Sequence, residues 1–122
     1  QQYNTNSKIC WVAGFSFGAW IAMQLLMRRP EINGFVSISP PANLRDFSFL
    51  APCPSSGLIV HGDKDNIASF DSTKILVEKL QKQKKVDINF KPIKGADHYY
   101  ENYSSEFESS IKDYINQTLK FD

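Results

Sequence analysis

The sequence is poor in cysteine, in net charge and in long hydrophobic runs, and each shortage excludes a class of protein. Two cysteines, Cys10 and Cys53, cannot build a disulfide framework or a cysteine-based metal cluster. Fourteen basic and 13 acidic side chains leave a net charge of +1, which predicts neither nucleic acid nor an anionic membrane as a partner. No run approaches the roughly 18 apolar residues of a membrane-spanning helix, and the polar start is unlike a signal peptide. We therefore expect a soluble, cytoplasmic protein.

The length of the chain sets its domain organisation. We expect residues 1–122 to form a single domain, because 122 residues leave no room for a second independent core. Hydrophobic residues make up 42% of the chain, and six glycines bring the apolar share close to that of ordinary globular proteins. Global disorder is therefore excluded.

Strand-like and helix-like patterns follow one another along the chain. The predicted strands are Ile9–Ala13, Gly34–Ser39, Gly57–Val60 and Val86–Ile93, and the predicted helices are Phe17–Met27, Ser69–Gln83 and a terminal helix with Phe107, Ile111, Tyr114, Ile115 and Leu119 as its apolar stripe. Pro92 lacks an N–H donor, so the last strand suits a sheet edge. Residues 40–56 contain four prolines and are predicted to be a long surface excursion. Strands separated by helices or long crossovers predict the α/β class, with a three-layer, mostly parallel sheet of about four strands.

A G-x-S-x-G pentapeptide, Gly14 to Gly18, lies between the first predicted strand and the first predicted helix. A serine on such a sharp turn has a strained backbone, and glycines two residues before and after it avoid clashes with the strand and the helix. We therefore expect Gly14 and Gly18 to be required by the turn. Ser16 is the candidate nucleophile, and the Phe17 backbone N–H is a candidate oxyanion donor.

A serine nucleophile needs a histidine base and a carboxylate that orients this base. His98 follows the last predicted strand and is the preferred base, while His61 directly follows the third strand and suits a structural hydrogen bond better. Asp65 is preferred as the acid because it lies deeper in the loop after the third strand than Asp63, which is better placed to tighten the turn. Asp97, next to His98, ranks third. The alternative acids stay open at this point.

Three motifs carry a resemblance to a known family: GFSFG between strand and helix, HGDKD after a later strand, and GADH before the terminal helix. Together they resemble the C-terminal half of an α/β-hydrolase, near the dienelactone hydrolase group. The resemblance implies that Ser16 is the nucleophile, Asp65 the acid and His98 the base. Dienelactone hydrolases proper carry cysteine at the nucleophile, so Ser16 favours esters or thioesters in general as substrates. No metal or organic cofactor is implied.

The resemblance also implies that half of the fold precedes the nucleophile strand, with a loop that supplies a second oxyanion N–H. We therefore expect a truncated α/β-hydrolase fold, impaired in activity, in which one side of the first strand is bare. Such an edge favours self-association or an N-terminal companion. The alternative is a catalytically silent module for binding or assembly.

Aromatic residues gather around the motif and in the excursion that follows it. Phe15 and Phe17 are candidate substrate contacts, and with Trp20, Phe47 and Phe49 they could line an apolar acyl pocket capped by residues 40–56. Packing in the core explains Trp20 equally well. The expected partner is a small-molecule ester, with no nucleic acid and no membrane.

Overall fold

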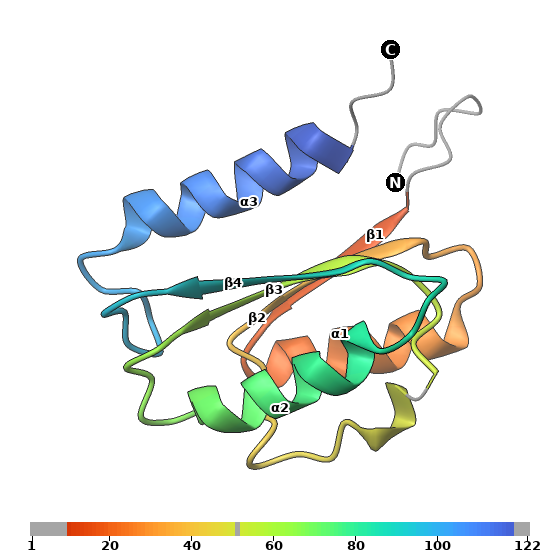
Figure 1. Cartoon of the computed structure of the whole chain (residues 1–122), viewed down its shortest axis with the longest axis horizontal. Helices are drawn as coiled ribbons and strands as arrows, with labels where there is room; N and C mark the ends of the chain where they lie inside the picture. Colours follow the sequence, from red (N-terminus) through yellow and green to blue (C-terminus); the bar gives the residue numbers. More distant parts are fainter. Residues whose placement is uncertain (1–9, 51, 119–122) are drawn as a thin grey trace.

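The computed structural model describes residues 10–50 and 52–118, in which four parallel strands form one sheet (Figure 1). The elements are, in chain order, β1 (Trp11–Phe15), α1 (Phe17–Arg28), β2 (Gly34–Ile38), a 3-10 helix (Ser48–Leu50), β3 (Gly57–Gly62), α2 (Phe70–Gln81), β4 (Ile88–Ile93) and α3 (Ser104–Thr118). The strands lie in the order β1-β2-β3-β4, and each neighbouring pair is parallel. The predicted α/β class with a four-stranded parallel sheet is confirmed.

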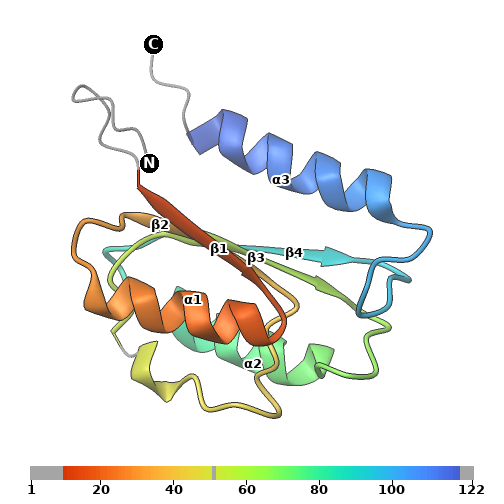
Figure 2. The ribbon, with the colours of Figure 1, turned by 180° about the vertical axis from the view of Figure 1, so that it is seen from behind.

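Helices cover both faces of the sheet and make three layers, with α1 and α2 on one face and α3 on the other (Figures 1 and 2). Successive residues of a strand point to opposite faces. In β3, Ile59 accordingly packs in the cluster with α1 and α2, whereas Leu58 and Val60 pack in the cluster under α3. None of the helices in the described part of the chain is long and apolar enough to cross a membrane.

The predicted strands are correct in number and order, but some of their ends differ. β1 continues to Phe15, which pairs with Ile38, beyond the predicted end at Ala13. β3 continues to Gly62, because His61 and Gly62 pair with residues of β4. His61 is therefore part of a central strand and not of the loop after it. Ile9 and Leu119, which the predictions include, lie outside the described residues.

The segment 40–56 is more deeply packed than the predicted surface excursion. Phe47, Leu50 and Cys53 are buried in the core cluster on the α1 and α2 side of the sheet. The Trp20 indole N–H also donates to the Asp46 carbonyl oxygen at 3.0 Å, which joins this segment to α1. The four prolines indicated irregular backbone correctly, but irregular backbone need not be exposed.

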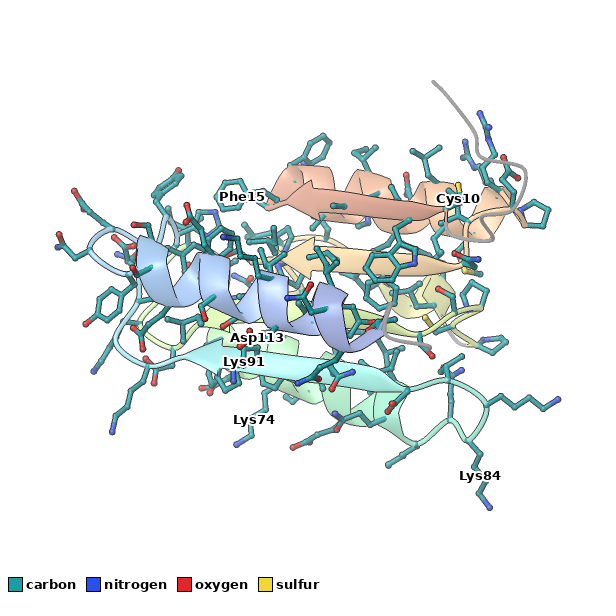
Figure 3. All side chains as sticks on the ribbon, turned by 90° about the horizontal axis from the view of Figure 1, so that it is seen from above. Cys10, Phe15, Lys74, Lys84, Lys91 and Asp113 are labelled. Atoms are coloured by element: carbon teal, nitrogen blue, oxygen red, sulfur yellow. The ribbon has the colours of Figure 1, made fainter. Side chains whose placement is uncertain are left out.

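The two edge strands of the sheet are β1 and β4. β4 lies at one edge, as Pro92 predicts, and β1 lies at the other, where among the described residues it pairs only with β2. Figure 3 labels Cys10 and Phe15 near opposite ends of β1. Since all four strands run the same way, the loops that follow β1, β3 and β4 meet at the Phe15 end of the sheet.

Candidate active site

The turn between β1 and α1 holds Ser16 in an uncommon backbone conformation, with φ 57° and ψ −121°. The Ser16 N–H donates to the Ile38 carbonyl oxygen at 2.8 Å, which ties the turn to β2. A Cβ atom on Gly14 would lie 2.2 Å from the carbonyl oxygen of Gly18, so only glycine fits there. A non-glycine residue at positive φ costs about 1–3 kcal/mol, and the packing around the turn must supply that energy.

The expectation for the second glycine of the motif was wrong. A Cβ atom on Gly18 would meet nothing within 4 Å apart from the helix's own backbone. The close approach in this turn is between Gly14 and the backbone of α1, so a side chain is excluded on the strand side only. The spacing of a motif cannot show on which side the contact falls.

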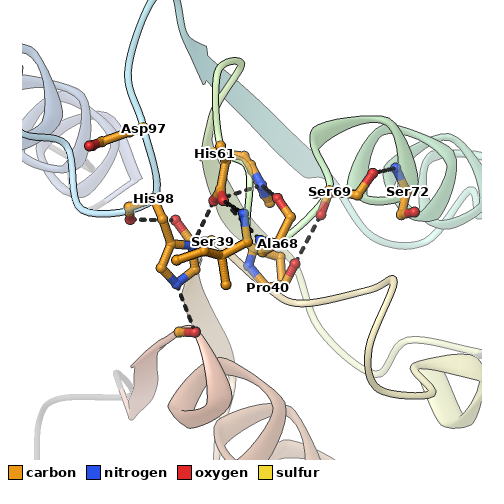
Figure 4. Close-up of polar contacts among 12 residues, drawn as sticks. Ser39, Pro40, His61, Ala68, Ser69, Ser72, Asp97 and His98 are labelled. Carbon is orange, nitrogen blue, oxygen red and sulfur yellow. Dashed lines mark hydrogen bonds and ion pairs between the residues drawn. The ribbon is translucent and has the colours of Figure 1, made fainter.

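The structure brings His98 next to Ser16, although the two residues are 82 positions apart in the sequence (Figure 4). The His98 Nε2 atom lies 2.9 Å from Ser16 Oγ, and His98 Nδ1 lies 2.7 Å from Asp65 Oδ2. A carboxylate only accepts hydrogen bonds, so Nδ1 carries the proton and Nε2 of the neutral ring accepts from the Ser16 hydroxyl. This is the arrangement in which an imidazole can remove a proton from a serine.

Asp65, Asp63 and Asp97 make different contacts. The Asp65 side chain is fully buried, and its Oδ1 accepts from the backbone N–H groups of Ile67 and Ala68, each at 2.8 Å. Asp63 Oδ1 instead accepts from the Gly95 N–H at 2.7 Å and so joins the loops after β3 and β4. Of these three carboxylates, Asp65 is the one in contact with the His98 ring.

Asp97 binds the backbone of its own loop. Its Oδ1 accepts from the N–H groups of Tyr99 and Glu101, at 3.2 and 3.1 Å, and so stabilises the turn that follows His98. In Figure 4 the Asp97 side chain points away from the imidazole of its neighbour. Adjacent loop residues diverge here, as the sequence analysis expected.

His61, the other histidine, lies behind the acid and not beside the serine. It is completely buried, and its Nε2–H donates to the Ala68 carbonyl oxygen at 2.7 Å. The same Nε2 atom lies 3.2 Å from Asp65 Oδ2, a contact that sequence reasoning missed because i,i+4 spacing indicates contact on a helix and not across a strand end. Burial lowers the pKa of His61 from its usual 6.5, partly opposed by the Ala68 carbonyl. The ring is therefore neutral near pH 7.

Tyr100 and Ser39, which sequence reasoning did not assign to the site, anchor the loop that carries His98. The Tyr100 hydroxyl donates to the Val60 carbonyl oxygen at 3.2 Å and pairs with the Ser39 hydroxyl at 2.8 Å. Tyr100 and Ser39 both have positive φ, 58° and 51°, without being glycine. Nothing in their local sequence signals this pairing, because 61 positions separate them.

The aromatic residues that flank Ser16 are partly exposed. Phe15 is 39% exposed, and its ring centroid lies 5.2 Å from that of His98. Phe17 is 50% exposed, and the Arg45 guanidinium lies over its ring at 4.8 Å. As the first residue of α1, Phe17 has a backbone N–H with no acceptor inside the helix, and the positive end of the helix dipole is at the same place.

A cavity of about 420 Å³ lies between residues 42–50 and α2. Phe47 lines it, but Phe15, Phe17, Trp20 and Phe49 do not, and neither do Ser16, Asp65 or His98. This cavity is therefore not the expected acyl pocket, and the pocket built from all five aromatic residues stays a prediction. Within residues 10–50 and 52–118, no group of three or more His, Cys, Asp or Glu side chains is arranged to hold a metal ion.

A parallel sheet between helical layers, with a serine, a histidine and an aspartate meeting at the carboxyl ends of its strands, defines the class of α/β hydrolases. Within that class the sequence matches the dienelactone hydrolase family over residues 1–121. The chain belongs to this family, which confirms the resemblance carried by the three motifs.

Known proteins resemble the chain over about half of their own length. An uncharacterized protein of Rickettsia prowazekii (strain Madrid E) is 53% identical over 119 residues, 94% of this chain and 50% of the relative. A candidate α/β hydrolase of unknown function from Agrobacterium tumefaciens has a TM-score of 0.90 and 54% identity, covering 93% of this chain and 52% of its own. An α/β serine hydrolase without a lid from Xanthomonas campestris has a TM-score of 0.75 and 26% identity, covering 92% and 49%.

Proposed function

We propose that this chain carries the triad of a serine hydrolase that cleaves small carboxylic esters or thioesters through an acyl-enzyme. The observation that supports it best is the continuous chain of contacts from Ser16 Oγ through the His98 ring to Asp65, at 2.9 and 2.7 Å. Membership of a hydrolase family and likeness to a serine hydrolase agree with this chemistry.

In the proposed reaction, His98 Nε2 takes the Ser16 proton while Oγ forms a bond to the substrate carbonyl carbon. The buried Asp65 carboxylate stabilises the resulting imidazolium and keeps its ring in place. The Phe17 N–H faces the oxygen that becomes negative in the tetrahedral intermediate. His98 then gives the proton to the departing alcohol or thiol as its bond to carbon breaks. A water molecule, activated by the same ring, hydrolyses the acyl-enzyme and regenerates Ser16.

The domain assignment made from the sequence, residues 1–122 as the C-terminal half of the fold, remains part of this proposal. The resemblance assigns a second oxyanion N–H to the other half. Loss of one such donor slows catalysis by about 10² to 10³. For residues 1–122 taken alone we therefore expect slow acylation, which a covalent probe detects more readily than turnover.

A fluorophosphonate probe tests this proposal because it phosphonylates only an activated serine. We expect labelling of the wild-type chain at Ser16, none of Ser16→Ala, and full labelling of Ser69→Ala. Ser69 is a matched control because its hydroxyl accepts from the Ser72 N–H at the start of α2 and touches none of the three triad residues.

The outcomes separate two classes of function. A folded wild-type chain that takes up no probe would contradict the hydrolase and favour the silent module. An observation that favours that module is the β1 edge, which among the described residues pairs only on its β2 side. Labelling that persists in Ser16→Ala would show that the nucleophile is another residue.

A further inference from the structure

The mechanism proposed above gives no role to His61 of β3, a buried titratable group. Its ring is 0% exposed, and Nε2 faces two oxygens, the Ala68 carbonyl at 2.7 Å and Asp65 Oδ2 at 3.2 Å. The second of these is the oxygen that accepts from His98 Nδ1 at 2.7 Å. His61 and His98, both labelled in Figure 4, therefore flank one carboxylate oxygen.

The surroundings of the His61 ring determine where its proton lies. Two acceptors at Nε2 require the proton there, because an unprotonated nitrogen would be repelled by both oxygens. Nδ1 is a buried nitrogen with no hydrogen-bond partner in residues 10–50 and 52–118, and a proton on it would be a buried donor without an acceptor there. The ring is accordingly the neutral Nε2–H tautomer, and the lowering of its pKa by burial acts in the same direction.

The contacts of His61 also close a ring of interactions around the acid. Ala68 donates its N–H to Asp65 Oδ1 at 2.8 Å and accepts from His61 at its carbonyl oxygen. The loop that carries Asp65 is thus held to a central strand by one imidazole. The Nε2–H group of His61, the positive end of the ring's N–H dipole, lies near Asp65 Oδ2. The same oxygen accepts the hydrogen bond from His98.

We propose that His61 is a positioning residue of the triad, which holds the Asp65 loop in place and stabilises the charge on the carboxylate oxygen shared with His98. The proposal rests on the proposed function for its effect on rate. A merely structural role of His61 would affect the rate whatever residue stands at position 65. The proposed role affects the rate only when the Asp65 carboxylate is present.

Kinetic variants test this coupling. His61→Leu keeps a side chain of similar bulk but removes the hydrogen-bond donor. We expect its acylation by p-nitrophenyl acetate to slow about 10- to 100-fold, with little change in KM. That factor corresponds to the loss of one hydrogen bond to a charged group. His61→Gln places an amide N–H near the lost Nε2 and should recover most of the rate. In an Asp65→Asn background, His61→Leu should lower the acylation rate by less than about threefold. An equal cost in both backgrounds, or no loss in His61→Leu, would overturn the proposal.

A spectroscopic measurement is independent of turnover, so it separates this inference from the proposed function. Imidazole ¹H–¹⁵N spectra of the wild-type chain should show His61 as the neutral Nε2–H tautomer, and the His98 Nδ1 proton should resonate far downfield because it bonds a carboxylate. The His98 signal should shift in His61→Leu and return toward its position in His61→Gln. A His61 proton on Nδ1, or an unchanged His98 signal in folded His61→Leu, would overturn the proposal. If His61→Leu does not fold, the wild-type tautomer and His61→Gln decide the question.

Discussion

The turn that holds Ser16 and the loop that holds Asp65 follow parallel strands of the same sheet, yet they are stabilised in different ways. The Ser16 turn depends on steric fit, since a strained residue packs where Gly14 has no side chain. The Asp65 loop depends on polar contacts, since backbone N–H groups and two imidazoles surround one carboxylate. A steric requirement appears in the sequence as glycine, whereas a polar network depends on partners that are distant in the chain.

The hydroxyl groups at the starts of α1 and α2 show the same difference. Ser69 caps α2 by accepting from the Ser72 N–H at 3.1 Å, whereas Ser16 precedes α1 without any side-chain cap. A capping hydroxyl stabilises a helix by about 1 kcal/mol. The Ser16 hydroxyl forgoes this contribution and contacts the His98 ring.

The largest effect is expected from breaking the polar network at its centre. Asp65→Asn should slow phosphonylation or acylation of Ser16 by about 10⁴-fold, because an amide no longer selects the His98 tautomer with its proton on Nδ1. Asp63→Asn is the matched control, since Asp63 accepts only from the Gly95 N–H among the contacts described and should keep the rate within about threefold. Initial rates of probe labelling measure both. A larger loss in Asp63→Asn would reverse the assignment of the acid.

The steric side of the comparison is tested by two identical substitutions. Gly14→Ala should lower the free energy of unfolding by about 3 kcal/mol, because its Cβ would meet the backbone of α1 at 2.2 Å. Gly18→Ala meets open space and should raise it by up to about 1 kcal/mol through the lower backbone entropy of alanine. Denaturant unfolding of the two variants measures the difference. Similar losses in both would contradict a steric restriction at Gly14 alone.

The smallest expected effect at neutral pH concerns Tyr100, which anchors the loop that carries His98. Tyr100→Phe should lower the free energy of unfolding by about 1 kcal/mol at pH 7, through loss of the hydrogen bonds to Val60 and Ser39.

At high pH the wild-type chain should lose more stability than Tyr100→Phe does. Burial raises the pKa of Tyr100 from 10.0 to about 12, although the Ser39 hydroxyl opposes this. The unfolded chain therefore loses the proton first, so stability is complete below pH 10 and falls between pH 10 and about 12, by roughly 3 kcal/mol. Tyr100→Phe has no phenolic group at this position, so its stability should not show this part of the fall at alkaline pH. Unfolding curves at several pH values measure it, and parallel declines in the two proteins would contradict the assignment.

Much of the fold could be predicted because its signals are local. The apolar run before Gly14, the alternation in Gly34–Ser39 and the helical spacing around Val77 each report one element, and the order of those elements predicts a parallel sheet. Errors arose where a contact between distant residues decides the outcome. Pairing with β4 carries β3 through His61, and the core recruits Phe47 from a segment that looked like surface loop.

The sequence by itself determined the elements, the turn at Ser16 and the candidates for the three polar side chains, because periodicity and glycine spacing act over a few residues. Only the tertiary structure decided that Asp65 and not Asp63 or Asp97 faces His98, and that His61 lies behind the carboxylate. The physical reason is that a hydrogen bond depends on distances of about 3 Å. Such distances between residues 33 or 82 positions apart are set by the packing of the whole sheet and its helices.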